Sequence, residues 1–173
     1  MAEFVIADTH FGDANILHFA QRPFKNITDM NNCLVASWNN VVSDDDIVYI
    51  IGDFVDPVYD MATAEAVLQL KGHKYLIRGN HDTLSDEEYF ALGIERVYDF
   101  PILKDGFYVF SHEPIFLNKA MPYANIFGHV HNNPIYQDFG KQFFCVSVER
   151  NALHYAPIEL NKVYRLMREV PND

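Results

Sequence analysis

Five short apolar segments, each ending abruptly in polar residues, constrain the fold of this chain more than any other feature. They span residues 4–7, 47–51, 75–77, 107–110 and 123–127. Each has the length of a strand and is rich in β-branched and aromatic residues. They are apolar nearly throughout, as expected of strands that are buried on both faces. The sequence therefore predicts an α/β domain with parallel strands.

The residues that follow these segments can bind metals or transfer protons. They are Asp8, His10, Asp53, Asn80, His81, Asp82, His112, His129 and His131. Five of the chain's eight histidines are among them. In open α/β sheets, ligands bind at the carboxyl ends of the strands. Gly52, Gly79 and Gly128 precede three of these positions and allow the backbone to turn tightly or to approach an ion. We expect one converging site.

His129 and His131 form a His-x-His pair at the end of the last segment. Side chains at i and i+2 of an extended strand leave the same face, so that both imidazoles can reach a common metal centre. A single pair of this kind also occurs on ordinary protein surfaces. The four other polar strand ends favour the metal interpretation.

The polar blocks, in their order along the chain, resemble the calcineurin-like metallophosphoesterase superfamily. The blocks are Asp8-x-His10, Gly52-Asp53, Gly79-Asn80-His81-Asp82, His112 and Gly128-His129-x-His131. The chain length and the opening Asp-Thr-His-Phe-Gly are most similar to the small single-domain prokaryotic and phage phosphoesterases. The resemblance implies a four-layer α/β/β/α sandwich of two packed mixed sheets with flanking helices, in a single domain over residues 1–173.

The resemblance also implies a site for two divalent metal ions. One ion would be held by Asp8, His10 and His131. The other would be held by Asn80, His112 and His129, and Asp53 would bridge the two. Carboxylate, imidazole and amide ligands suit Mn²⁺, Fe, Zn²⁺ or Ni²⁺ better than a thiolate-preferring ion. Mn²⁺ is our first choice, and Mg²⁺ is a further candidate.

The chemistry implied is hydrolysis of a phosphate ester. Two ions would lower the pKa of a bridging water, and the hydroxide would attack phosphorus in line with the leaving oxygen. His81 resembles the family's general acid. Asp82 is the natural partner to orient its imidazole, and the alternative for Asp82 is a cap or turn carboxylate beside Thr83.

The predicted function is a metal-dependent phosphoesterase, with a phosphodiesterase preferred over a phosphomonoesterase. A nucleotide phosphatase or nuclease of the same superfamily is the first alternative. The second is a non-catalytic protein-binding scaffold on this fold. The scaffold alternative predicts loss of His81 or of ligands, whereas His81 and all seven implied ligands are present.

Four further residues are candidate substrate contacts. Asn15, His18 and Arg22 lie in or just after a predicted helix over residues 14–21, which leaves the strand-end edge. Each could equally belong to a solvated helix face. Arg78 directly precedes Gly79, and its guanidinium could bind phosphate or form a structural ion pair.

The rest of the chain supplies the connecting elements. Helices are predicted over residues 29–42, 59–70 and 157–169, and strands over 93–100 and 143–148, the latter in a second sheet. Ser85 and Glu88 have the spacing of a capping box at the start of a short acidic helix. The segment 113–123 is either a mobile rim over the site or a packed loop.

The composition limits the partners. The net charge is −11, with 24 acidic against 13 Lys and Arg residues, and no basic stripe is apparent. This favours a small phosphorylated substrate over duplex nucleic acid. No apolar run approaches the roughly 20 residues of a membrane span, and no signal-peptide core follows Met1. Two unclustered cysteines fit a reducing compartment, so we expect a cytoplasmic protein without a membrane partner.

Overall fold

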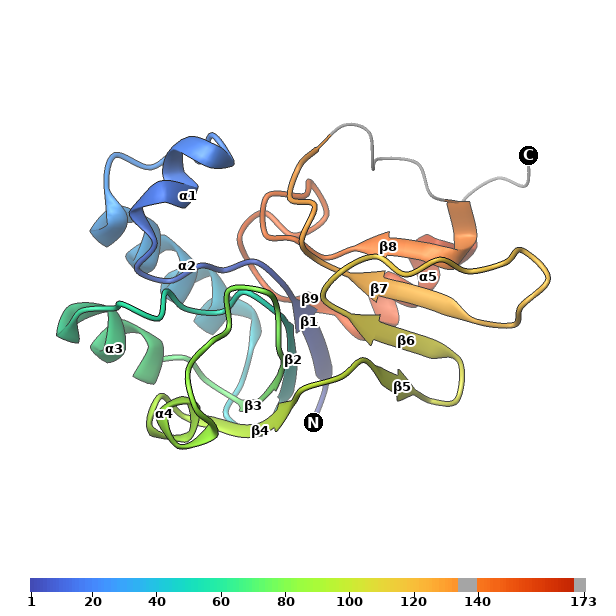
Figure 1. Cartoon of the computed structure of the whole chain (residues 1–173), viewed down its shortest axis with the longest axis horizontal. Helices are drawn as coiled ribbons and strands as arrows, with labels where there is room; N and C mark the ends of the chain where they lie inside the picture. Colours follow the sequence, from blue (N-terminus) through green and yellow to red (C-terminus); the bar gives the residue numbers. More distant parts are fainter. Residues whose placement is uncertain (134–139, 170–173) are drawn as a thin grey trace.

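The computed structural model describes residues 1–133 and 140–169, which build two packed sheets with helices beside them (Figure 1). The first sheet has the strand order β4-β3-β2-β1-β9. Its strands are β1 (Glu3–Ile6), β2 (Ile47–Ile51), β3 (His73–Ile77), β4 (Ile94–Tyr98) and β9 (Ile158–Glu159). The first four are parallel, and β9 pairs with β1 in the antiparallel direction. The predicted parallel strands are therefore confirmed.

The second sheet has the order β5-β6-β7-β8. Its strands are β5 (Ile102–Lys104), β6 (Tyr108–Ser111), β7 (Ala124–Phe127) and β8 (Phe143–Cys145). β5 is antiparallel to β6, and the other pairs are parallel. Both sheets are thus mixed, as the resemblance implied. The strand predicted over 143–148 leaves this sheet after Cys145, because Val146 and Val148 bond to the backbone of Ala7 at the end of β1.

The two sheets meet through apolar side chains. The rings of Tyr49 in β2 and Phe110 in β6 contact each other edge to face, with centroids 5.3 Å apart. Val5, Ile6 and Ile50 are fully buried. Burial on both faces explains why these strands are apolar throughout rather than alternating.

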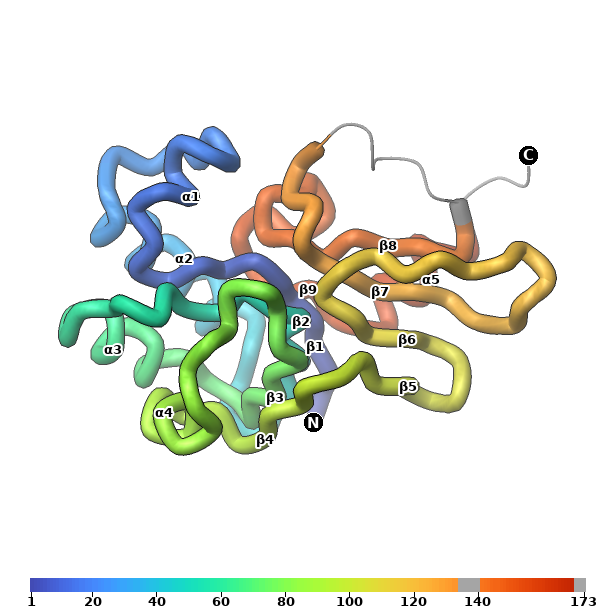
Figure 2. The backbone as a smooth tube through the Cα atoms, in the orientation of Figure 1, coloured from blue at the N-terminus to red at the C-terminus, as the bar shows by residue number. Residues whose placement is uncertain are grey.

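The helices follow the predicted order. They are α1 (Ala14–Phe19), α2 (Ile27–Val41), α3 (Met61–Leu68), α4 (Asp86–Ala91) and α5 (Leu160–Glu169), and α1, α3 and α5 are shorter than predicted. Figures 1 and 2 show α2 and α3 on the side of the first sheet that faces away from the second sheet. α5 packs against the second sheet through Tyr164, which stacks on Tyr108 at a centroid distance of 3.8 Å.

Local signals set the helix boundaries. The predicted start of α2 at residues 28–29 is wrong, because the side chain of Asn26 accepts from Asp29 N and caps the helix two residues earlier. The capping box of Ser85 and Glu88 before α4 is confirmed. Among the residues described, no helix combines the length and the apolar composition needed to cross a membrane.

Candidate metal centre

The predicted ligands meet where the central strands of both sheets end, and they do so in an unusual backbone conformation. In the described ranges, nine residues other than glycine have a positive φ, and five of them are predicted ligands. Those five are Asp8, His10, Asp53, His129 and His131. Non-glycine residues adopt this region rarely, and such strain persists only where the surrounding structure enforces it. Its concentration here indicates a functional site.

The first ligand group consists of Asp8, His10 and His131, and all three residues are buried. Each offers one possible ligand atom, and these atoms lie within 4.8 Å of one another. The residues are the three that the resemblance assigned to one ion. The backbone N–H of His129 donates to both carboxylate oxygens of Asp8, at 2.9 and 3.0 Å, and so fixes that carboxylate.

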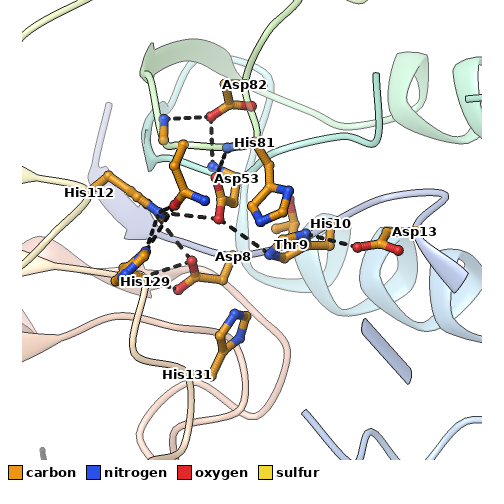
Figure 3. A network of polar contacts seen from close by, with 12 residues as sticks. Asp8, Thr9, His10, Asp13, Asp53, His81, Asp82, His112, His129 and His131 are labelled. Atoms are coloured by element: carbon orange, nitrogen blue, oxygen red, sulfur yellow. Dashed lines mark hydrogen bonds and ion pairs between the residues drawn. The ribbon is translucent and has the colours of Figure 1, made fainter. Parts of the chain in front are cut away.

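The second ligand group consists of Asp53, His112 and His129, whose ligand atoms also lie within 4.8 Å of one another. The side-chain oxygen of Asn80 joins them, 3.0 Å from His112 Nε2 and 2.9 Å from His129 Nδ1. Figure 3 shows His112 and His129 on one side of the Asp8 and Asp53 carboxylates and His10 on the other.

The Asp53 carboxylate lies between the two groups. Its Oδ2 is 3.5 Å from His10 Nε2 and 3.2 Å from His112 Nε2. Burial would raise the pKa of Asp53, but the hydrogen bond and charge of His112 and the charge of His10 outweigh it and lower the pKa to about 2. Burial likewise opposes the protonated form of His112, yet Asp53 and Asp8 raise its pKa to about 9. One carboxylate thus serves both groups.

Three observations show that these residues are suited to bind a pair of divalent ions. His10 Nε2 is buried and has no hydrogen-bond partner, which is costly unless something else binds it. The donors are carboxylate, imidazole and amide atoms, the set that such ions prefer. A Cβ atom at Gly52 would lie 2.2 Å from His112 Nδ1, and one at Gly79 would lie 2.3 Å from Asp53 Oδ1. Only glycine leaves room for these ligands.

Glu149 orients His131 and was not identified from the sequence. Its Oε1 lies 3.1 Å from His131 Nδ1, which leaves Nε2 as the ring nitrogen available to a metal. Burial opposes the charged carboxylate, but the contacts with His131 and Arg22 lower the pKa of Glu149 to about 2. The residue belongs to no motif, and its position just after a predicted strand was the only sequence signal for it.

Arg22 is buried and bonded within the protein, which argues against both the predicted substrate contact and a solvated helix face. Its side chain turns inward and is fully buried. The guanidinium donates to the carbonyl oxygens of Asp8 and Thr9 and to Glu149 Oε1. A cation committed to these three acceptors holds the backbone after β1 in place and is not free to bind phosphate.

Arg78 forms the structural ion pair that was the alternative to phosphate binding. Its guanidinium donates to Asp86 at 2.7 Å and to Asp99 at 3.0 Å. The remaining nitrogen donates to the carbonyl oxygens of Asp82 and Leu84. Its contribution is to tie the loop after β3 to α4 and to the end of β4.

Asp82 does not orient His81, which corrects the role predicted for it. Its carboxylate accepts from the backbone N–H groups of Asp53 at 2.7 Å, Phe54 at 3.0 Å and Gly79 at 2.8 Å, and from the Tyr89 hydroxyl at 3.0 Å. Burial raises the pKa of Asp82. The carboxylate is no helix cap either, because it joins the loop after β2 to the loop after β3.

Of the remaining predicted residues, His81 and Asn15 lie at the rim of the centre. His81 is exposed, and its backbone N–H donates to Asp53 Oδ1 at 2.9 Å. Its ring meets the His10 ring edge to face at 5.3 Å. Asn15 is exposed on α1 and lines a cavity of about 380 Å³ together with His81. His18 is also exposed but does not line that cavity.

The sequence of this chain is similar to those of known proteins. The sequence profile described as calcineurin-like phosphoesterase matches residues 4–172. An uncharacterized protein of Methanocaldococcus jannaschii is 30% identical in an alignment of 171 positions that covers 96% of this chain and 91% of that protein.

Two solved structures are similar to this one. A protein of unknown function from Aquifex aeolicus has a TM-score of 0.73 at 25% identity, over 95% of this chain and 98% of that one. The nuclease MPE of Pseudomonas putida has a TM-score of 0.54 at 24% identity, over 75% of this chain and 61% of its own.

Proposed function

Because the chain belongs to the calcineurin-like phosphoesterase family, we propose that it hydrolyses a small phosphodiester with the help of two divalent ions and with His81 as the general acid. The observation that carries this proposal is the Asp53 carboxylate shared by two ligand groups. The backbone N–H of His81 donates to that carboxylate, and the His81 imidazole lies against the ring of His10. The family and the two ligand groups support a metal-dependent phosphoester hydrolase. Diester preference, Mn²⁺ and the role of His81 are the further parts of the proposal.

Different residues of the chain would bind the metal ions and supply the proton. The first ligand group and the second, with Asn80, would hold the ions. When bound, these would lower the pKa of a water molecule and neutralise charge on the phosphoryl oxygens. In the overall reaction the water oxygen bonds to phosphorus, the ester P–O bond breaks, and the leaving oxygen takes up a proton. We assign that proton to His81. Imidazole is the commonest general acid, and the exposed His81 ring lies against the ring of His10, a predicted ligand.

The protein's charge supports a small substrate. With a net charge of −11, most of the surface repels a polyanion, whereas two bound divalent ions would attract a single phosphate locally. The two cysteines, Cys33 and Cys145, are free, which supports a reducing compartment such as the cytoplasm.

A nuclease is the second candidate. The structure of the Pseudomonas putida nuclease shares the fold, and a nuclease also cleaves phosphodiesters. The net negative charge favours a substrate of one or a few nucleotides over a long nucleic acid.

The test begins with chelated protein to which Mn²⁺, Ni²⁺, Zn²⁺ or Mg²⁺ is added back. We expect metal to restore hydrolysis of bis-p-nitrophenyl phosphate, at a higher rate than that of p-nitrophenyl phosphate. Faster hydrolysis of the monoester would contradict the diester preference. Metal-loaded protein without activity on either substrate would contradict the hydrolase itself.

The role of His81 needs a substrate whose leaving group is poor. His81→Ala is expected to lower kcat on an alkyl ester by about 10²- to 10⁴-fold, and to lower it less on p-nitrophenyl esters, which need little protonation. His73→Ala is the matched control, because His73 pairs with Glu95 at the opposite end of β3. Equal turnover of the alkyl ester by wild type and His81→Ala would show that another group supplies the proton.

A further inference from the structure

Three cavities among the described residues contain predicted ligands, and one of them is lined by Phe19, His129 and His131. The other two lie one beside each ligand group. The first of these two, here called the Phe19 cavity, has a volume of about 380 Å³ and is lined by His10, His81 and His131 together with Asn15, Phe19 and Asp56. Its metal-ligand residues belong to the first ligand group. His81 lies in its wall, so a leaving group protonated by His81 would occupy this cavity.

The second, here called the Phe100 cavity, has a volume of about 330 Å³. Asn80 and His112 line it, together with Arg78, Asp99, Phe100 and Glu113. Its metal-ligand residues belong to the second ligand group. Because His10 and His112 lie on opposite sides of Asp53 (Figure 3), a phosphate at the centre has one cavity on each side.

Each of these two cavities is lined by a phenylalanine whose ring is exposed to solvent. Phe19 is 77% exposed and Phe100 is 79% exposed. The Phe19 ring meets the His131 ring edge to face at 5.8 Å, which places it directly beside a predicted ligand. An exposed ring at the wall of a binding cavity offers an apolar face on which a planar group can stack.

The charges of the two cavities exclude substituents with further phosphates. Asp13 and Asp56 line the Phe19 cavity, and no Lys or Arg among the described residues lines it. In the Phe100 cavity, Asp99 and Glu113 are acidic, and all the guanidinium nitrogens of Arg78 already donate to protein oxygens. Carboxylates favour substituents that carry hydroxyl or amino donors.

We propose that the substrate is a diester with a planar, donor-bearing group on each side of a single phosphate, the chemistry of a dinucleoside monophosphate. Phe19 would stack on the group that leaves, and Phe100 on the group that stays with phosphorus. Each cavity lies near the lower end of the roughly 300–1,000 Å³ range of small-molecule sites, a size suited to one nucleoside. The inference rests on the proposed function, because the phosphate must occupy the metal centre.

The test uses the full-length protein loaded with Mn²⁺ and two esters that share the p-nitrophenol leaving group. One is thymidine 5′-(p-nitrophenyl phosphate), and the other is methyl p-nitrophenyl phosphate. Phe100→Ala is expected to raise KM for the thymidine ester about 5- to 100-fold more than for the methyl ester, as for the loss of one stacked base. Phe19→Ala is expected to raise KM for both esters, because both leaving groups are aromatic.

Phe90→Ala is the matched control, because Phe90 is also exposed but lies on α4 and lines neither cavity. Circular dichroism would verify that each variant is folded. Metal-dependent hydrolysis with the same KM values in wild type, Phe19→Ala and Phe100→Ala would overturn this inference and leave the proposed function standing. Loss of all metal-dependent hydrolysis in the wild type would overturn both.

Discussion

The two ligand groups differ in how firmly the protein holds them. In the first group, the second ring nitrogen of each histidine is fixed by a carboxylate, with His10 Nδ1 3.4 Å from Asp13 and His131 Nδ1 3.1 Å from Glu149. In the second group, His112 Nδ1 lies 3.0 Å from the carbonyl oxygen of Ile51. His129 is exposed, and its Nδ1 faces only the other ligands Asn80 and His112.

This difference predicts two unequal metal sites. A carboxylate behind an imidazole fixes its tautomer and raises its basicity, and such outer partners typically change metal affinity 10- to 100-fold. The first ligand group is also buried, so it loses less side-chain entropy when an ion binds. We therefore expect the first site to bind its ion more tightly and to release it later under chelation.

The largest effect is expected from Asp53→Asn, which removes the carboxylate common to both groups. Both ions should bind more weakly, and hydrolysis should fall by more than about 100-fold, the upper effect of losing an outer partner. Metal content after gel filtration and steady-state kinetics would measure this. Asp44→Asn, at an exposed turn, is the control. Retention of two ions by Asp53→Asn would contradict the bridging position.

Gly52→Ala is expected to damage the second group selectively. Its Cβ would lie 2.2 Å from His112 Nδ1 and 2.8 Å from Gly79 Cα, so the imidazole must move. Gly106→Ala is a matched control, because Gly106 also has a positive φ but no atom within 4 Å of its added Cβ. Both variants should lose about 1 kcal/mol of stability from backbone strain, and only Gly52→Ala should also lose the weaker ion. Equal metal content in the two variants would contradict the prediction.

Glu149→Gln tests the first group. Loss of the charge behind His131 should weaken the tighter site about 10- to 100-fold and bring the two affinities closer together. A Mn²⁺ titration followed by electron paramagnetic resonance would resolve both classes of site. Glu65→Gln, an exposed change on α3, should leave both affinities as in the wild type. A weakened second site with an unaltered first site would reverse our assignment of the two groups.

The sequence was sufficient to predict which candidate ligands come together but not the residues that hold them in place. Asp8 and His131 follow apolar strands within local motifs, so their convergence could be inferred from the strand ends alone. Glu149 and Arg22 are 127 residues apart in the chain, and their contact exists only once the two sheets have packed. Asp82 was misread for the same reason, because its partners come from two different loops.

Short elements were also beyond the sequence signal. β5 has three residues and β9 has two, which is too few for a periodicity to emerge. The helix predicted from residue 157 begins only at Leu160. The residues before it form β9, because Ile158 pairs with Val5 in β1. Tertiary pairing thus overrode a helical pattern at that end of the chain.

The pH dependence of metal binding tests the second ligand group through His112. The pKa of this imidazole is raised from 6.5 to about 9 in the metal-free protein. A metal ligand must be neutral, so below pH 9 an ion must displace a proton from this imidazole. Affinity at the second site should therefore rise about tenfold per pH unit up to about pH 9 and then level off. Calorimetric titrations between pH 6.5 and 9.5 would measure the slope. An affinity that is constant over this range would show that His112 does not bind the ion.

The smallest effect is expected from Tyr89→Phe, which removes one of the four donors to Asp82. A hydrogen bond to a charged group contributes about 1.5–3 kcal/mol, and the three backbone donors remain, so we expect a loss at the lower end of that range. This would lower Tm by about 3–6 °C in a chain of this size. Asp82 fixes the loops that carry Asp53 and Asn80, so any loss of metal should be larger at the second site, which uses both residues. Tyr75→Phe is the control, because it removes a hydroxyl on β3 that does not contact Asp82. An equal decrease in Tm in Tyr75→Phe and Tyr89→Phe would show that the hydrogen bond from Tyr89 to Asp82 does not account for the effect.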